Sequence, residues 1–188
     1  MKKYVLILAF FASNLFAQTG YYKIDPEHSF ANWKIRHVVA KTAGTIPNMT
    51  GTIQINLEDM NQTSVQVEMS LLDINSDHKK RDNHIQEEKF LNTALNPKIQ
   101  FVSHQISMTD DNNGIVSGVL SLGGVEKKID IPFTVLGFGE DPWGGYRVGL
   151  EGNLILHASD FGYTWGVKEN SALGDKIEIN LLLEGIKQ

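Results

Sequence analysis

Ser64-Val65-Gln66-Val67-Glu68-Met69-Ser70-Leu71 is the stretch that decides the fold class. Apolar residues take every second position and polar residues take the positions between them. An extended chain places all the apolar side chains of such a stretch on one face. Strands with one apolar and one polar face are typical of antiparallel sheets, which bury one side and expose the other. The stretch therefore predicts a half-buried strand of an all-β protein.

Similar alternation recurs through the chain, and turn residues separate the runs. Asp110-Asp111-Asn112-Asn113-Gly114 and Gly123-Gly124 are typical of hairpin turns. Strands that each carry one apolar face favour an antiparallel barrel or sandwich. The eight predicted strands lie at residues 31–36, 52–57, 64–71, 98–107, 114–122, 128–135, 148–157 and 177–184.

One segment departs from the β pattern. Residues 79–91 contain neither Gly nor Pro and few β-branched residues. Asn83 with Gln86 could form a capping box, and Asn96-Pro97 stops a helix because the residue before proline avoids helical dihedral angles. The sequence predicts one short helix between the third and fourth strands.

The N-terminus has the three-part pattern of a secretory signal peptide. Lys2 and Lys3 precede a short apolar run, which is too short to span a bilayer. We therefore expect residues 1–17 to be a signal peptide, residues 18–188 to be one domain, and the protein to be periplasmic or secreted.

Composition excludes several classes of protein. With 41% hydrophobic and 21% charged residues among 188, the chain is globular in character. The absence of Cys excludes disulfides and thiolate metal sites. Removal of Lys2 and Lys3 with the signal peptide would leave 15 Lys and Arg against 22 Asp and Glu, a net charge of −7. The net charge of −5 of the full chain argues against nucleic acid as a partner.

Several motifs together resemble the YceI family of exported, lipocalin-like, polyisoprenoid-binding proteins. They run in order from about residue 22 to residue 185. The resembling stretches are Ile24-Asp25-Pro26-Glu27-His28-Ser29 with Trp33-Lys34-Ile35-Arg36-His37, Arg81-Asp82-Asn83-His84-Ile85 with Phe90-Leu91, Asn96-Pro97-Lys98-Ile99-Gln100-Phe101, Gly118-Val119-Leu120-Ser121-Leu122-Gly123-Gly124-Val125, Asp141-Pro142-Trp143-Gly144-Gly145-Tyr146-Arg147 and Ser159-Asp160-Phe161-Gly162.

The resemblance implies an eight-stranded antiparallel barrel, lipocalin-like, around a long apolar cavity. It also implies that the cavity holds an isoprenoid or another long-chain lipid. An eight-stranded barrel is either just filled by its own side chains or wide enough for one ligand. The first strand mixes small and large residues on the face assigned to the lumen, and small Ala31 would leave room for a ligand. The expected function is to hold a lipid for transport, storage or sequestration.

The predicted ligand-binding residues come from the first strand and from the family motifs. Two roles are open for the Arg81 side chain. It either meets a polar head group, or it clamps carboxylates or carbonyls and anchors the helix. The predicted set is Ser29, Ala31, Trp33, Ile35, His37, Arg81, His84, Phe90, Phe101 and Phe161.

Catalytic and metal chemistry have little support in the sequence. Six His residues are present, but no His-x-x-x-His or His-Glu-x-x-His spacing occurs, and zinc needs three or four converging ligands. No Gly-x-Ser-x-Gly elbow occurs either. We expect no enzyme activity, no cofactor and no metal. The sequence leaves open a metal-dependent or hydrolytic enzyme on the same barrel, a filled barrel serving as an interaction scaffold, and a homodimer.

Overall fold

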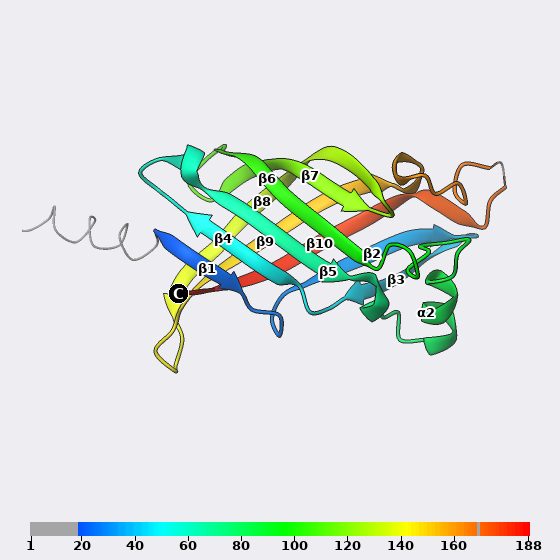
Figure 1. Ribbon diagram of the computed structural model, residues 1–188, viewed down its shortest axis with the longest axis horizontal. Coiled ribbons are helices and arrows are strands. Elements are labelled where there is room, and N and C mark those ends of the chain that lie inside the picture. Colours follow the sequence, from blue (N-terminus) through cyan, green and yellow to red (C-terminus); the bar gives the residue numbers. More distant parts are fainter. Residues whose placement is uncertain (1–18, 169) are drawn as a thin grey trace, which may run out of the picture.

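The computed structural model describes residues 19–168 and 170–188, so the predicted signal peptide lies outside the described residues. One antiparallel sheet rolls into an elongated barrel (Figure 1). Its strands are β1 (Gly20–Ile24), β2 (Phe30–His37), β3 (Ala40–Ile46), β4 (Thr50–Ile55), β5 (Ser64–Ser70), β6 (Lys98–Met108), β7 (Asn113–Leu122), β8 (Val125–Glu140), β9 (Tyr146–His157) and β10 (Leu173–Lys187).

The barrel closes through β1, which pairs with β4 on one side and β10 on the other. Within the described chain the closed circuit is therefore β1 followed by β4 to β10, eight strands in all. β2 and β3 extend this sheet, because the first part of β10 pairs with β2 and only its last residues pair with β1. The predicted all-β, eight-stranded antiparallel barrel is confirmed.

The predicted strands correspond to β2 and β4 to β10, whereas β1 and β3 were not predicted. β1 is only five residues long, too short for a reliable alternation. β3 reads Ala-Lys-Thr-Ala-Gly-Thr-Ile and has a single large apolar residue, Ile46. It lies at the end of the strand order beside β2, so few of its side chains reach the core.

The helical insertion lies where the sequence places it, between β5 and β6. Helix α2 (Lys79–Ile85) is shorter than predicted, and its N-cap is His78, whose ring accepts a hydrogen bond from the Arg81 N–H. The predicted capping box at Asn83 is therefore wrong. Turns rather than helix follow Ile85. Three 3-10 segments complete the elements: η1 (Met60–Gln62), η2 (Leu71–Asp73) and η3 (Ala158–Phe161).

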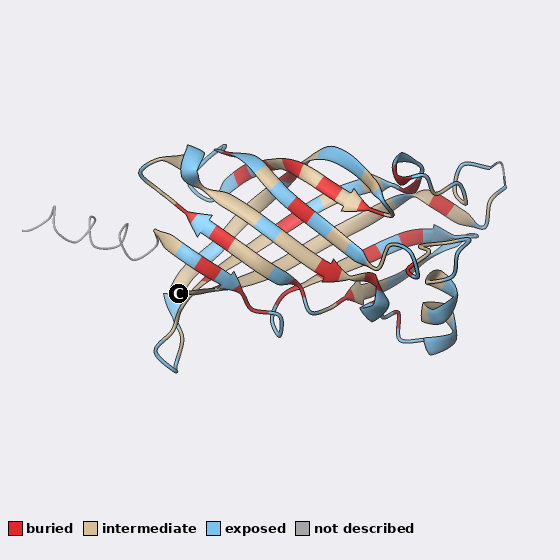
Figure 2. Cartoon of the chain, viewed as in Figure 1, coloured by how far each residue is buried: buried red, intermediate tan, exposed pale blue. Residues whose placement is uncertain are grey.

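Burial alternates most clearly along β7, and Figure 2 colours the buried residues red, the intermediate ones tan and the exposed ones blue. In β7 the buried residues are Gly114, Val116, Gly118, Leu120 and Leu122, while Ile115 between them is exposed. The apolar face of the strands from β4 to β10 turns inward and surrounds one interior. Among the described residues, no helix has the length and apolar character needed to cross a bilayer.

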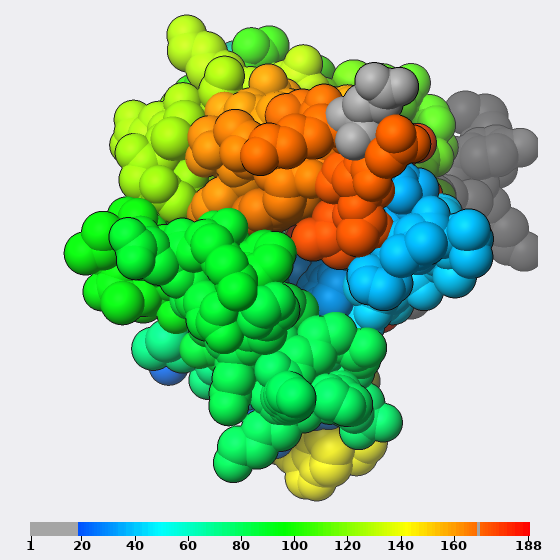
Figure 3. All heavy atoms as spheres, turned by 90° about the vertical axis from the view of Figure 1, so that its right-hand side faces the viewer, coloured from blue at the N-terminus to red at the C-terminus, as the bar shows by residue number. Residues whose placement is uncertain are grey.

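The two ends of the barrel differ in their covering. Figure 3 shows the end where α2 (green), the β9–β10 connection (orange) and the β2–β3 hairpin (blue) come together. At the other end lie η1, the β6–β7 turn and the β8–β9 connection (Figure 1). Among the described residues, the connections at this second end are short.

Candidate functional site

The barrel encloses an apolar cavity of about 780 Å³. This volume lies within the range of small-molecule sites, roughly 300–1,000 Å³. The lining comes from β2 to β10 and is dominated by aliphatic and aromatic side chains, among them Ala31, Ile53, Met69, Phe101 and Phe133. Such a lining can hold a long hydrocarbon chain by removing its surface from water.

Two glycines of β7 leave room for aromatic rings of the cavity wall. A Cβ at Gly118 would collide with the ring of Phe101, and a Cβ at Gly114 would lie 2.7 Å from Cζ of Phe133. Real Cβ contacts are not this short, so any side chain at either position would displace a ring or the neighbouring backbone. Both rings line the cavity, and the glycines let them pack against the wall.

The cavity reaches solvent at the β6–β7 turn. Asp110, Asp111 and Asn112 line it there, and all three are exposed. At the α2 end the lining is apolar, with Leu122 from β7 and Leu156 from β9. The cavity is therefore a long apolar space with a polar, acidic rim at one end.

Only Ala31 of the first-strand candidates lines this cavity. Trp33 and Ile35 share its face and are buried, as predicted, but lie outside the cavity lining. Ser29 is fully buried, and its Oγ accepts a hydrogen bond from the Glu184 N–H at 2.9 Å. His37 is exposed at the end of β2, so the expectation that it points into the lumen is wrong.

Trp33 instead faces a second, more open hollow of about 730 Å³ beside the β2–β3 hairpin. Its indole lies where a side chain on Gly44 would otherwise stand. The loop at Asn75 crosses the edge of β3 and pairs with the backbone of Thr45. Within the described chain the Trp33 Nε1 has no hydrogen-bond partner.

Arg81 is held by the loop that precedes its own helix. Its Nε donates to the Ser76 Oγ at 2.7 Å and its Nη2 to the Ser76 carbonyl at 2.5 Å. The neighbouring Asp82 accepts from the Ser76 N–H at 2.9 Å. Arg81 thus clamps a carbonyl and anchors α2, which is the structural reading left open by the sequence. It lies outside the cavity lining.

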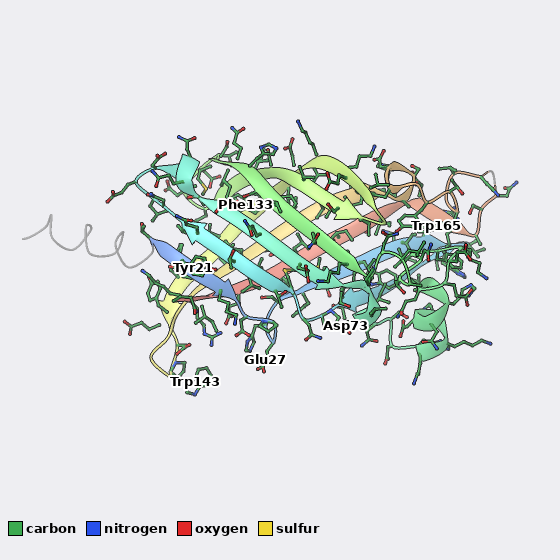
Figure 4. The ribbon with its side chains drawn as sticks, in the orientation of Figure 1. Tyr21, Glu27, Asp73, Phe133, Trp143 and Trp165 are labelled. Carbon is green, nitrogen blue, oxygen red and sulfur yellow. The ribbon has the colours of Figure 1, made fainter. Side chains whose placement is uncertain are left out.

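His84 and Phe90 belong to an aromatic cluster outside the cavity. The ring centroids of His84 and Phe90 are 4.7 Å apart, and Phe90 lies 5.8 Å from Trp165 of the β9–β10 connection. Trp165 in turn stacks on Tyr163 at 4.6 Å. Figure 4 labels Trp165 at this end, close to α2. The cluster ties the helical insertion to the β9–β10 connection.

The last two predicted ligand-binding residues, Phe101 and Phe161, lie in different surroundings. Phe101 is buried and lines the cavity, whereas Phe161 of η3 is buried in the core without lining it. The structure therefore brings Ala31 and Phe101 together around one space and leaves the other eight predicted residues outside that lining. The cavity also contains many aliphatic residues of β4 to β10 that alternation alone could have identified.

Sequence reasoning missed an ion-pair cluster centred on Arg147. Its Nε donates to Asp141 at 2.7 Å, and its Nη1 contacts Asp25 at 2.8 Å and Glu184. The hydrogen bonds from Asp141, Asp25 and Glu184 raise the pKa of Arg147, and Arg147 in turn holds the pKa of Asp141 below its ordinary value. Asp25 and Arg147 both occur in the family motifs quoted above, so those motifs could have pointed to the cluster.

The same cluster contains a three-residue group with metal-ligand atoms. Oxygen or nitrogen atoms of Asp25, His28 and Glu184 lie within 4.8 Å of one another. The Arg147 guanidinium already contacts both carboxylates, and His28 Nδ1 lies 2.8 Å from Asp25. These contacts explain the group as an ion-pair network.

A Ser-His-Asp group near η3 lacks the geometry of a nucleophile and its base. The Ser159 Oγ donates to Asp175 at 2.9 Å, and His157 Nδ1 lies 3.2 Å from the same carboxylate. In a catalytic triad the hydroxyl would bond to the imidazole and the imidazole to the carboxylate. Here Asp175 also accepts from the Ser159 N–H, so it fixes the start of η3.

The YceI-like domain model matches residues 22–185. The chain belongs to the YceI-like family. A UPF0312 protein of Azotobacter vinelandii is 33% identical over 92% of this chain and 90% of its own length, and one of Pseudomonas syringae is 33% identical over 92% and 89%.

Solved structures share the barrel of this YceI-like chain. Burkholderia cenocepacia BcnA superposes with a TM-score of 0.76 at 20% identity, covering 86% of this chain and 98% of its own. A Campylobacter jejuni YCEI protein gives 0.71 at 22% identity, covering 100% and 99%. A polyisoprenoid binding domain from Saccharophagus degradans gives 0.69 at 15%, covering 89% and 98%. At these identities the likeness shows the fold.

Proposed function

We propose that the protein holds one long-chain lipid, an isoprenoid or a similar amphiphile, inside the barrel for transport, storage or sequestration. The observation that carries the proposal is the 780 Å³ cavity with its apolar lining. Family membership and the polyisoprenoid-binding neighbour support the same class of ligand. Ala31 and Phe101 are the predicted residues that would touch the hydrocarbon chain.

Affinity would come from burial of the lipid's apolar surface. Each Å² removed from water contributes about 25 cal/mol, before the costs of ordering the chain and fixing the ligand. An enclosed apolar space serves this purpose without any charged partner. Carriage without chemistry is therefore favoured over a metal-dependent or hydrolytic activity, whose candidate groups are engaged in structural hydrogen bonds.

We also propose that the protein is exported. The N-terminal pattern and the family both support a periplasmic or secreted protein after removal of residues 1–17. N-terminal sequencing of the protein from its own cells tests this. A chain beginning near Gln18 supports export, and an intact Met1 on soluble protein contradicts it.

Lipid binding is tested by filling the cavity from β2. Ala31→Trp places an indole in the lumen and should abolish retention of geranylgeraniol, measured by native mass spectrometry. Lys34→Ala, on the exposed face of the same strand, is the control and should retain it. Circular dichroism checks that both variants fold. Equal retention by a folded Ala31→Trp protein contradicts an internal site, and loss in both variants would trace the effect to β2 itself.

A further inference from the structure

We propose that the cavity selects lipids whose head group carries no negative charge, such as an isoprenoid alcohol or quinone, over the same chain ending in phosphate. This inference rests on the proposed function and adds the chemical class of the head group. It follows from the two places where a head group could lie: the end of the cavity beside α2 and the rim at the β6–β7 turn.

A head group at the α2 end of the cavity would lose its hydrating water without gaining hydrogen-bond partners from the protein. Leu120 and Leu122 of β7 and Leu156 of β9 line the cavity there. An ionised group without hydrogen-bond partners in such surroundings loses its hydration at a cost of many kcal/mol. The hydrocarbon tail therefore lies at this end, and the head group lies toward the β6–β7 turn.

The rim at the turn is acidic. Asp110 and Asp111 both line the cavity where it meets solvent, and no Lys, Arg or His occurs among the described residues of the lining. Hydrogen bonds from the Asn112 N–H, and from the side chain and N–H of Asn113, hold the pKa of Asp110 below its ordinary value. Asp110 is therefore ionised at neutral pH, and a phosphate at this rim would meet a like charge.

Hydrogen bonds within the turn and to β8 hold the rim in place. The Asn112 carbonyl accepts from the Val135 N–H at 2.7 Å, and the Thr134 Oγ1 donates to the Asn113 Oδ1 at 2.7 Å. Asp110 accepts from the N–H groups of Asn112 and Asn113 at 2.9 and 2.8 Å. These bonds tie the turn to β8 and hold the Asp110 carboxylate at the mouth.

The test compares geranylgeraniol with geranylgeranyl phosphate by isothermal titration at low and high salt. The two ligands share one tail and differ in head-group charge, close to −2 for a phosphate monoester at neutral pH. We expect the alcohol to bind about tenfold more tightly at low salt, with the ratio narrowing at high salt because salt screens exposed charges. Equal affinities with normal alcohol binding overturn this inference and leave the proposed function intact. If neither ligand binds, the proposed function fails and the inference fails with it.

A charge reversal at Asp111 tests whether the preference for the alcohol over the phosphate arises at the rim. Asp111→Lys should raise the affinity for the phosphate relative to the alcohol by about fivefold or more at low salt. Asp73→Lys makes the same change of net charge at an exposed position of η2, outside the cavity lining, and should leave the ratio as in the unaltered protein. An equal shift in both variants, or no shift in Asp111→Lys, contradicts a head-group site at the β6–β7 turn.

Discussion

At the scale of single residues, Arg147 joins three parts of the chain. It contacts Asp25 before β2, Asp141 in the β8–β9 connection and Glu184 in β10. The carboxylates of Asp25 and Asp141 are about nine-tenths buried, at 10% and 9% exposure. Removing the guanidinium would leave them without their shared cation. Trp143, by contrast, points away from the barrel at the tip of the same connection (Figure 4).

Arg147→Met should lower the free energy of unfolding by about 2–3 kcal/mol. Breaking a fully buried ion pair by removing one partner costs about 3–5 kcal/mol. The loss should be smaller here because the Arg147 side chain keeps 21% exposure. Urea unfolding at neutral pH measures it, with Lys128→Met on the exposed face of β8 as the control. A loss no larger than in the control would contradict the structural role.

The same variant should change how stability depends on pH. The Arg147 hydrogen bond lowers the folded pKa of Asp141 below its unfolded value of about 3.8. The resulting stabilisation is present above the unfolded pKa and is lost as pH falls through the folded pKa. We therefore expect the stability difference between the unaltered protein and Arg147→Met to shrink between pH 5 and acid pH. A difference that is constant across this range would show that Asp141 is not coupled to Arg147.

At the scale of elements, the alternation predicted the long strands but not the short ones. β5 and the middle of β8 alternate apolar and polar residues, and the apolar ones, such as Val65, Val67 and Ile131, line the cavity. β1 and β3 are strands because they pair with neighbouring strands, and their own residues show no clear alternation of apolar and polar side chains. The end of α2 likewise depends on the turn hydrogen bonds that follow Ile85, which no local pattern reveals.

The helical insertion packs against the β9–β10 connection and does not line the cavity. Phe90 is partly buried against His84 and Trp165. Phe90→Ala should therefore reduce stability by about 1–2 kcal/mol, since aromatic pairs contribute about 0.5–1.5 kcal/mol each beyond area burial. Lipid affinity should not change. Thermal unfolding and geranylgeraniol titration measure the two effects, and a fall in affinity with unchanged stability would place Phe90 in the ligand wall.

β7 offers a matched test of how the cavity wall is built. Gly118→Ala forces the Phe101 ring or the Val102 carbonyl to move and should cost about 1–3 kcal/mol, with weaker lipid binding. Gly149→Ala on β9 would meet Leu136 Cβ at an ordinary 3.5 Å and should be close to neutral. Urea unfolding and titration compare them. A Gly118→Ala protein as stable and as lipid-competent as Gly149→Ala would contradict the packing of Phe101.

At the scale of the whole molecule, the candidate site was only partly predictable. Ala31 was predicted because it is the small member of an inward face, and Phe101 because it belongs to one of the family motifs. Other predicted residues have structural roles instead, since Arg81 clamps the Ser76 carbonyl and His84 belongs to the aromatic cluster. Which inward-facing residues line the cavity depends on where β2 and β3 leave the closed circuit.

The central claim, that the lumen of the barrel holds the lipid, is tested most directly by two neighbouring residues of β7. Val116 is buried and lines the cavity, whereas Ile115 is exposed on the outer face. Titration with geranylgeraniol should show binding lost in Val116→Trp and retained in Ile115→Trp, with both variants folded by circular dichroism. Retained binding in folded Val116→Trp, or loss in Ile115→Trp alone, would place the lipid outside the barrel and contradict the account.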